Sequence, residues 1–162
     1  MSTNDFILLL DRFAAAVVAN DPAGFVALFS QDGIYEDLFF GRHRGRGEIA
    51  AMLRRFHDTG REYRWEFVDA LANEAIGYAR FHFSYASTLP GYAGKPVYFE
   101  GISLFRFTSG LITEYCEAWD RGVALVQLGF PAERVHRVVA KAADALNEVP
   151  EARRHLDRFR RP

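Results

Sequence analysis

The stretch VYFEGISLFRFTSGLITEYCEAWDR, residues 97–121, has the clearest strand pattern in the sequence, because apolar and polar side chains alternate on both sides of a break at TSG. Alternation of this kind is typical of half-buried strands. We expect two antiparallel strands, Val97–Phe107 and Leu111–Arg121, joined by a three-residue hairpin loop with Gly110 in the left-handed region. The sequence therefore predicts an antiparallel sheet built outward from this hairpin.

The loop length sets which residues lie opposite one another. A three-residue loop places Phe107 opposite Leu111, so odd-numbered residues face odd-numbered residues along the hairpin. The same register sets Ser103 opposite Tyr115 and Gly101 opposite Glu117. Residue parity then decides which side chains share a face of the sheet.

Two earlier segments, Tyr63–Leu71 and Gly77–Ser87, show the same period and extend the sheet to a four-stranded meander. Its odd face is an apolar wall, whereas its even face mixes charged residues with Tyr78, Tyr98, Ile102 and Leu104. The odd residues of the wall are Tyr63, Trp65, Phe67, Leu71, Ala79, Phe81, Phe83, Tyr85, Val97, Phe99, Phe105, Leu111, Tyr115 and Trp119.

Glu117 and Ser103 are the polar exceptions on this wall. An ionised carboxylate in apolar surroundings is costly, so Glu117 should either hold its proton or find a partner. Such a group is a candidate functional residue. The alternative is that Glu117 lies at the open end of the sheet and meets water or an arginine. Ser103 gives a weaker signal, since a strand serine often bonds a neighbouring carbonyl.

The N-terminal third of the sequence predicts helices around one strand. Apolar residues at helical spacing predict a helix from about Asn4 to Ala19, and Asp21 and Pro22 open a short second helix over Ala23–Phe29. The segment GRHRGRGEIAAMLRRF predicts a third helix. Between them lies a strand, Gly33–Phe40, with two adjacent acids, Glu36 and Asp37, of which one should face the interior and the other should face water.

Composition excludes several classes of function. The net charge of −1 over 162 residues does not fit a general nucleic-acid-binding surface. The single cysteine, Cys116, allows neither a disulfide framework nor a cysteine metal site, and no histidine has a second histidine at ligand spacing. The apolar run FILLL is too short for a membrane span or a secretion signal. We expect a cytoplasmic protein that uses no metal.

The order of elements resembles the nuclear transport factor 2-like cone fold. The resemblance rests on RFAAAVVANDPAGFVALFSQDGIYED, GRHRGRGEIAAMLRRF and EGISLFRFTSGLITEYCEAWDRGVALVQLGF. The closing QLGF is most similar to the SnoaL-like branch, which includes polyketide cyclases. The resemblance implies an α+β fold, with a cone-shaped, curved antiparallel sheet wrapped around N-terminal helices over residues 1–130, and a C-terminal extension over residues 131–162.

A more distant resemblance to the ketosteroid isomerases carries over residue by residue. The catalytic base of that branch falls on Asp37, which implies that Asp37 faces the interior and Glu36 faces water. Its two oxyanion-binding positions fall on Phe13 and Ser103. Phe13 has no hydroxyl and a serine is a poor acid, so the isomerase's own route is disfavoured. In the SnoaL-like cyclases the acid/base group of the last long strand falls on Glu117 or on Asp120.

These resemblances imply a site for a small hydrophobic carbonyl compound, without an organic cofactor. Asp37 would remove a proton next to the carbonyl, and protonated Glu117, with Ser103 or Tyr115, would bond the developing enolate. The substrate would contact Phe13, Trp65, Phe81, Phe83, Phe99, Tyr115 and Trp119. Three alternatives stay open: Asp37 caps a turn before FFG, the pocket binds without turnover, or the chain is a dimeric interaction module. The family implies a homodimer through the outer sheet face.

The C-terminal segment predicts one more helix. Pro131 opens it, and Val135, Val138, Val139, Ala142 and Leu146 form an apolar stripe at helical spacing. The stripe would cover either the opening of the cone or a neighbouring subunit. Beyond Pro150 we expect a solvated, partly disordered basic tail.

Overall fold

The computed structural model describes residues 2–159 and contains a six-stranded sheet in the order β2-β1-β6-β5-β4-β3. The elements are α1 (Thr3–Val18), α2 (Pro22–Ala27), β1 (Phe29–Asp37), β2 (Gly41–Arg44), α3 (Arg46–Asp58), β3 (Gly60–Ala72), β4 (Ile76–Ser87), β5 (Pro96–Thr108), β6 (Leu111–Trp119), α4 (Arg121–Leu128), α5 (Ala132–Asn147), α6 (Pro150–Leu156) and a 3-10 turn (Asp157–Phe159).

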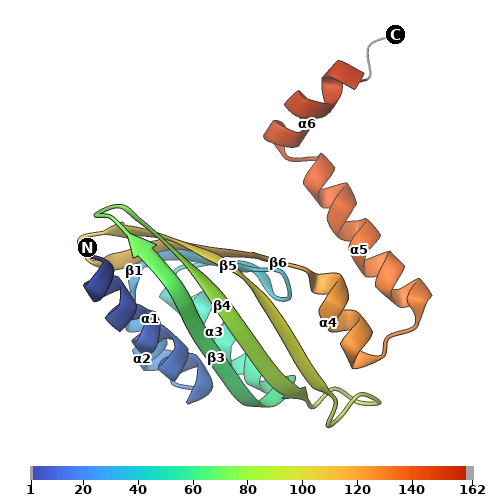
Figure 1. Ribbon diagram of the computed structural model, residues 1–162, viewed down its shortest axis with the longest axis horizontal. Helices are drawn as coiled ribbons and strands as arrows, with labels where there is room; N and C mark the ends of the chain where they lie inside the picture. The colour runs from blue at the N-terminus through green and yellow to red at the C-terminus, as the bar shows by residue number, and fades with distance from the viewer. Residues whose placement is uncertain (1, 160–162) are drawn as a thin grey trace.

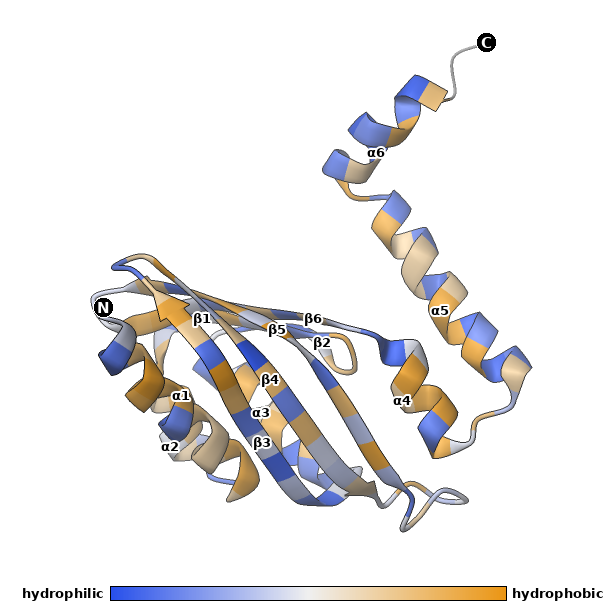
Figure 2. Ribbon diagram, viewed as in Figure 1, coloured by the Kyte–Doolittle hydropathy of each residue, from blue (hydrophilic) through white to orange (hydrophobic). Residues whose placement is uncertain are grey.

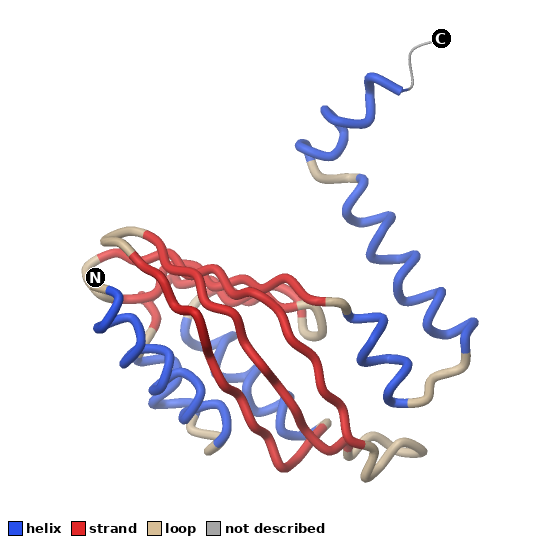
Figure 3. Tube along the Cα trace, viewed as in Figure 1, coloured by secondary structure: helices blue, strands red, loops and turns tan. Residues whose placement is uncertain are grey.

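The sheet is curved and unclosed, and α1, α2 and α3 lie on one side of it (Figure 1). The long strands β3, β4, β5 and β6 form the predicted antiparallel meander (Figure 3). The α+β cone class is thus confirmed. One pairing is parallel, because β1 lies beside β6 and runs in the same direction. This pairing brings the ends of β1 and β6 to the same edge of the sheet.

The inner face of α1 supplies much of the core. Its buried residues are Phe6, Leu9, Leu10, Phe13, Ala16 and Val17, the apolar positions that recur at helical spacing in the sequence. Ser2 caps the helix through a reciprocal pair of bonds with Asp5. Phe13 packs edge-on against Phe25, Trp65 and Phe105. Burial of these rings fixes α1 against the inner face of the sheet.

The short second helix ends earlier than predicted. Asp21 accepts a bond from the Gly24 N–H and Pro22 is the first helical residue, as expected. Phe29, however, is already the first residue of β1, and β1 ends at Asp37. Strand β2, which pairs back onto β1 after a three-residue turn, was not predicted. Four-residue strands carry too little periodicity to predict.

The register of the central hairpin differs from the prediction by two residues. Ser103 lies opposite Glu117, and Gly101 lies opposite Trp119. The turn contains only Ser109 and Gly110, both with positive φ, which suits a tight two-residue hairpin turn. A bulge between Arg106 and Phe107 then restores odd-to-odd pairing. The predicted parity is therefore right although the predicted loop is wrong, and Glu117 has a different cross-strand neighbour from the one expected.

A second bulge, in β3, changes which side chains of the predicted apolar wall face the core. Asp69 has a positive φ of 54°, and the β3–β4 register shifts between Val68 and Leu71. Parity reverses beyond this point, so Leu71 is 71% exposed instead of facing the core. Likewise Ile112, and not Leu111, is fully buried on β6.

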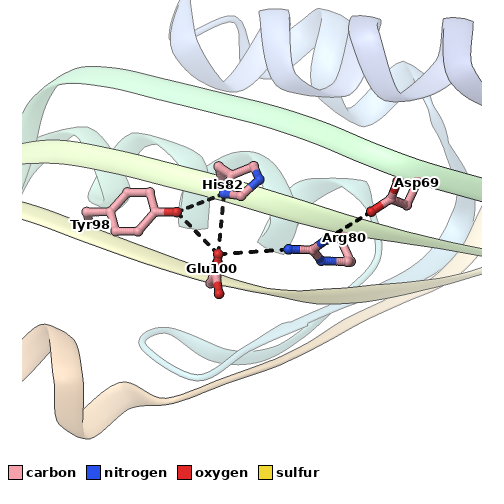
Figure 4. Close-up of polar contacts among 5 residues, drawn as sticks. All are labelled: Asp69, Arg80, His82, Tyr98 and Glu100. Carbon is pink, nitrogen blue, oxygen red and sulfur yellow. Dashed lines mark hydrogen bonds and ion pairs between the residues drawn. The ribbon is translucent and has the colours of Figure 1, made fainter.

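The outer face of the sheet carries a polar network beside exposed apolar residues. Glu100 lies between Arg80, His82 and Tyr98, and Arg80 also reaches Asp69 at 3.0 Å (Figure 4). The His82 ring and the Tyr98 hydroxyl are 2.8 Å apart. Exposed ion pairs of this kind add little stability. We therefore expect the network mainly to keep this face ordered and polar.

Helix α4 follows directly on β6, where the predicted strand continues to Arg121. The Asp120 carboxylate accepts bonds from the Gly122 and Val123 N–H groups and so begins the helix. The Gln127 side chain bonds both the N–H and the carbonyl of Tyr98, at 2.7 and 2.8 Å. Gln127 thus replaces a strand partner where β6 has ended, which fixes α4 against β5.

Helices α5 and α6 extend away from the sheet (Figure 1), and α5 shows alternating apolar and polar bands (Figure 2). Val139 and Leu146 of the predicted stripe are 44% and 64% exposed. The stripe therefore does not cover the opening of its own cone. The segment after Pro150, predicted as a partly disordered tail, is helical to Leu156; residues 160–162 of that tail lie outside the described residues.

Candidate functional site

Two carboxyl groups meet where β1 and β6 end. The parallel register pairs Tyr35 with Tyr115 and Glu36 with Cys116, which puts Asp37 and Glu117 at the next position of each strand. Both acids line a small cavity of about 10 Å³. Aromatic rings form the rest of its wall, contributed by Tyr35, Phe39, Phe56, Trp65, Phe83 and Phe99.

Asp37 is buried and holds the turn that follows it. Its Oδ1 accepts hydrogen bonds from the backbone N–H groups of Phe39 (2.8 Å), Phe40 and Gly41 (3.3 Å). Burial raises the pKa of Asp37, while these three bonds and one from the Tyr35 hydroxyl oppose the rise because they favour the ionised form. Asp37 therefore has the turn-capping role that the sequence left open, and it also faces the cavity as expected.

Glu36 points the other way. Its carboxylate forms an ion pair with Arg42 at 2.6 Å, and its side chain is 44% exposed. The alternation of neighbouring strand residues thus separates the two acids as predicted.

Glu117 is held by two neutral donors. Its Oε2 accepts from the Tyr115 hydroxyl and its Oε1 from the Trp119 indole N–H, each at 2.7 Å. Part of its surface stays accessible, yet rings enclose the carboxyl. Desolvation, and secondarily the charge of Asp37, raises the pKa of Glu117 to about 8. Glu117 is therefore mostly protonated at neutral pH, one of the two states the sequence predicts.

The environments of the two acids differ in a way that can separate their protonation states. Three backbone N–H groups stabilise the negative charge of Asp37, whereas Glu117 has aromatic neighbours and lies next to that charge. A pair of carboxyls in such contrasting surroundings can hold one proton acceptor and one proton donor. Within residues 2–159 no arginine lines this cavity, since Arg64, Arg80 and Arg106 lie on the exposed face.

A larger apolar pocket of about 240 Å³ lies next to the cavity, on the side covered by α4. Leu125 and Leu128 of α4 line it, together with Phe39, Phe56 and Phe83, which line the small cavity as well. These three rings therefore form the wall between the pocket and the carboxyls. The pocket is smaller than the roughly 300–1,000 Å³ typical of drug-sized ligands, so it suits a compact molecule.

The predicted ligand-contact residues fall into three groups. Trp65, Phe83 and Phe99 line the small cavity. Tyr115 and Trp119 hold Glu117 and do not line either space; the Trp119 ring also stacks on Phe99 at 3.9 Å. Phe13 and Phe81 belong to the core, where each is at most 1% exposed, because α1 and the inner sheet face close over them.

Ser103 lies behind the site. It is fully buried, and its Oγ lies 3.2 Å from the Tyr115 hydroxyl, which in turn donates to Glu117. Its contact with the carboxyl is therefore indirect and runs through Tyr115. The register explains this: Ser103 is opposite Glu117, and Tyr115 bridges the gap between their side chains.

Several lining residues were not predicted from the sequence. Tyr35 shares the parity of Asp37 and could have been found by that signal. Phe39 lies in the turn and Phe56 at the end of α3, so strand parity says nothing about either. Leu125 comes from α4, a short helix for which the sequence patterns give no prediction, because residues 122–128 lie between the predicted strand and the predicted helix after Pro131.

The indole N–H of Trp65 is buried without a hydrogen-bond partner among residues 2–159. Among the described residues, its Nε1 is the one buried side-chain nitrogen or oxygen without a hydrogen-bond partner. Leaving such a donor unpaired costs about 1–3 kcal/mol. Strand parity marks Trp65 only as an apolar contact and says nothing about its N–H.

Residues 2–159 contain no group of three or more His, Cys, Asp or Glu side chains arranged to hold a metal ion. Nor does any helix in this range have the length and apolar character needed to cross a membrane.

The curved sheet over three helices, with acids and aromatic rings at its open end, defines a cone-fold protein with a candidate small-molecule site. A family model described as a SnoaL-like domain matches residues 10–115, and the chain belongs to this family. A search of curated proteins finds no significant match.

Several solved structures share the fold. One is a hypothetical protein of Catenulispora acidiphila DSM 44928 with a ketosteroid isomerase-like fold, in complex with trimethylamine; it is 21% identical, with a TM-score of 0.70 over 77% of this chain and 95% of that one. A second is an epoxide hydrolase of M. tuberculosis, which is 22% identical, with a TM-score of 0.63 over 85% of this chain and 97% of that one. A third is a provisionally named polyketide cyclase of Xanthomonas campestris pv. campestris, which is 22% identical, with a TM-score of 0.63 over 77% of this chain and 97% of that one. At these identities the likeness shows the fold alone.

Proposed function

We propose that this protein is a cofactor-free acid–base enzyme that cyclises or isomerises a small hydrophobic carbonyl compound. The observation that carries the proposal is the meeting of Asp37 and Glu117 in one aromatic cavity, where surroundings raise the pKa of Glu117 to about 8. Its membership of the SnoaL-like family and its fold likeness to a provisionally named polyketide cyclase agree with this class of chemistry.

In the proposed reaction, Asp37 takes a proton from the carbon next to the carbonyl. Its Oδ1 is occupied by backbone N–H groups, so the other carboxylate oxygen is the base. Protonated Glu117 donates a hydrogen bond to the oxygen that becomes an enolate, which stabilises charge as it develops. Tyr115, backed by Ser103, keeps the Glu117 carboxyl in place.

The substrate reaches these groups only if a ring moves. The space beside the carboxyls holds about 10 Å³, whereas the apolar pocket holds about 240 Å³. Phe39 lies on the short turn after Asp37 and contributes to the wall between the two spaces. Rotation of the Phe39 ring would join them without disturbing the buried core.

The separate pocket favours a second candidate function, a binding protein without turnover. Its apolar lining and its α4 cover suffice to hold a compact hydrophobic ligand away from the acids. The two candidates share a ligand class and differ in whether a proton leaves the ligand.

Exchange of α-protons separates the two candidates. We expect 2-tetralone, a compact apolar ketone, to exchange its α-protons with D2O faster in the presence of the protein than in buffer, as followed by NMR and mass spectrometry. Asp37→Asn should lower this exchange by at least about 100-fold, because the amide cannot act as a base. The asparagine Oδ1 can still accept the turn's N–H bonds, so the variant should stay folded.

The controls are chosen to separate chemistry from structure. Asp37→Ala removes both the base and the cap, and should lower stability as well as exchange. If 2-tetralone binds the wild-type protein yet exchanges no faster than in buffer, the enzyme proposal is wrong and the binding function stands.

We also propose that two copies associate through the outer sheet face and act in the cytoplasm. Tyr78, Tyr98 and Ile102 are each about half exposed there, at 48%, 48% and 51%, beside the network around Glu100. Apolar residues gathered on an otherwise polar face are typical of an association surface.

A further inference from the structure

The unpaired Trp65 N–H points to a feature of the ligand. An indole nitrogen can only donate, so its partner must be an acceptor. Phenylalanine rings surround the indole, with centroids 5.0 to 5.9 Å away: Phe13, Phe67, Phe81 and Phe83. Ring faces offer at most a weak contact to an N–H group. The described part of the chain therefore supplies no strong acceptor for this donor.

The other polar groups of the cavity do not serve Trp65 either. Both oxygens of Glu117 already accept bonds, from Tyr115 and Trp119. The second oxygen of Asp37 and the Tyr35 hydroxyl also line the cavity, but neither accepts a hydrogen bond from the Trp65 Nε1. Trp65 lines the same cavity and is 8% exposed. A buried donor that finds no acceptor among the described residues calls for an acceptor from outside the protein.

The size of the cavity limits that acceptor to about one atom. A space of about 10 Å³ is near the minimum for a single water molecule. The larger apolar pocket begins on the other side of Phe39, Phe56 and Phe83. A ligand that fits both spaces has a compact hydrocarbon body and one oxygen at its end.

We propose that the Trp65 N–H binds the terminal oxygen of a neutral ketone or aldehyde in this cavity and so selects such compounds over hydrocarbons and carboxylates. The proposal rests on the proposed function for its ligand class and adds the group that recognises the oxygen. Trp65 and protonated Glu117 would then donate to the same oxygen from two sides. A carboxylate is rejected, because its charge would lie next to that of Asp37 and its second oxygen finds no space.

The test compares the binding of three compounds with the same two rings. They are 2-tetralone, tetralin, which lacks the oxygen, and tetralin-2-carboxylate, which has a charged carboxylate in its place. We expect the wild-type protein to bind the ketone most tightly. Trp65→Phe keeps an aromatic ring and removes the N–H. It should raise the dissociation constant of 2-tetralone about tenfold, because one hydrogen bond is lost, and change that of tetralin by less than about twofold.

A second measurement needs no variant. The chain has two tryptophans, so the indole N–H region of a proton–nitrogen NMR spectrum contains two signals, from Trp65 and Trp119. Addition of 2-tetralone should move the Trp65 signal downfield, and tetralin should not. Trp119 already donates to Glu117 and should shift less.

Three outcomes would overturn the proposal. The first is that Trp65→Phe weakens the binding of 2-tetralone and of tetralin equally. The second is that the Trp65 N–H signal does not respond to the ketone, or shows contact with water alone. The third is that the wild-type protein binds neither 2-tetralone nor tetralin. These results are independent of α-proton exchange. If exchange depends on Asp37 while the Trp65 signal stays fixed, the proposed function stands and this inference fails; the reverse result leaves a selective binding site without catalysis.

Discussion

At the scale of single residues, the site depends on how two similar carboxyls are solvated. Asp37 receives three backbone N–H bonds in a turn that it also organises. Glu117 receives bonds from two side chains and has a charged neighbour, so burial dominates and its pKa rises to about 8. The same chemical group therefore gives a candidate base at one strand end and a candidate acid at the next.

Glu117 should make stability depend on pH. Its folded pKa of about 8 lies above the ordinary value of 4.5, so the folded state keeps a proton that the unfolded chain releases. Its contribution to stability is therefore full below pH 4.5 and falls as pH rises toward 8. Glu117→Gln does not titrate. We expect urea unfolding to show the variant gaining stability relative to the wild type across this window.

A matched change on the other face measures the effect of the substitution alone. Glu36 is exposed and paired with Arg42. Glu36→Gln therefore measures how the loss of a surface glutamate changes the free energy of unfolding. A difference between wild type and Glu117→Gln that stays constant with pH would contradict the raised pKa.

At the scale of elements, the parallel neighbours β1 and β6 create the site. Strands that run side by side in one direction end at one edge, so Asp37 and Glu117 meet although they lie far apart in the chain. The β5–β6 hairpin then decides which residues support Glu117. Its tight turn and bulge place Gly101 opposite Trp119 and leave room for the indole that donates to Glu117.

Gly101 should be intolerant of even a methyl group. A Cβ there would lie 2.5 Å from the Ala118 carbonyl oxygen and 2.8 Å from atoms of Phe81 and Trp119. We expect Gly101→Ala to lower the free energy of unfolding by about 1–3 kcal/mol through overpacking. It should also shift the Trp119 indole signal in the NMR spectrum.

Gly47 is the control for this change. It lies in the first turn of α3, and an added methyl group would have no other atom within 4 Å, so Gly47→Ala should be neutral or stabilise by up to about 1 kcal/mol. Denaturant unfolding compares the two. Equal effects at both glycines would argue against tight packing around Trp119.

In the molecule as a whole, two apolar surfaces within residues 2–159 are exposed. One is the outer sheet face with Tyr98 and Ile102, and the other is the apolar stripe of α5 with Val139 and Leu146. Helix α4, held by Gln127, covers the apolar pocket, so α5 is not needed there.

Association through the outer sheet face can be tested by charge substitution. We expect light scattering after size exclusion to give a dimer mass for the wild type and a monomer mass for Ile102→Lys, because a buried unpaired charge disrupts an interface. Leu8→Lys, at an exposed position of α1, should stay dimeric. If Leu146→Glu breaks the dimer and Ile102→Lys does not, α5 is the interface and the sheet-face proposal is wrong.

The pattern of the sequence predicts the three N-terminal helices, the helix after Pro131, the long strands, the opposite facing of the neighbouring acids Glu36 and Asp37, and an acid on the aromatic wall. These features follow from periodicity and parity, which are properties of short segments. Tertiary structure decided the pairing of β1 with β6, the two-residue shift that puts Ser103 behind Tyr115, the cover by α4, and the narrow cavity at Trp65. Each of these depends on how distant segments fill space together, and close packing of side chains is not encoded in the period of any one segment.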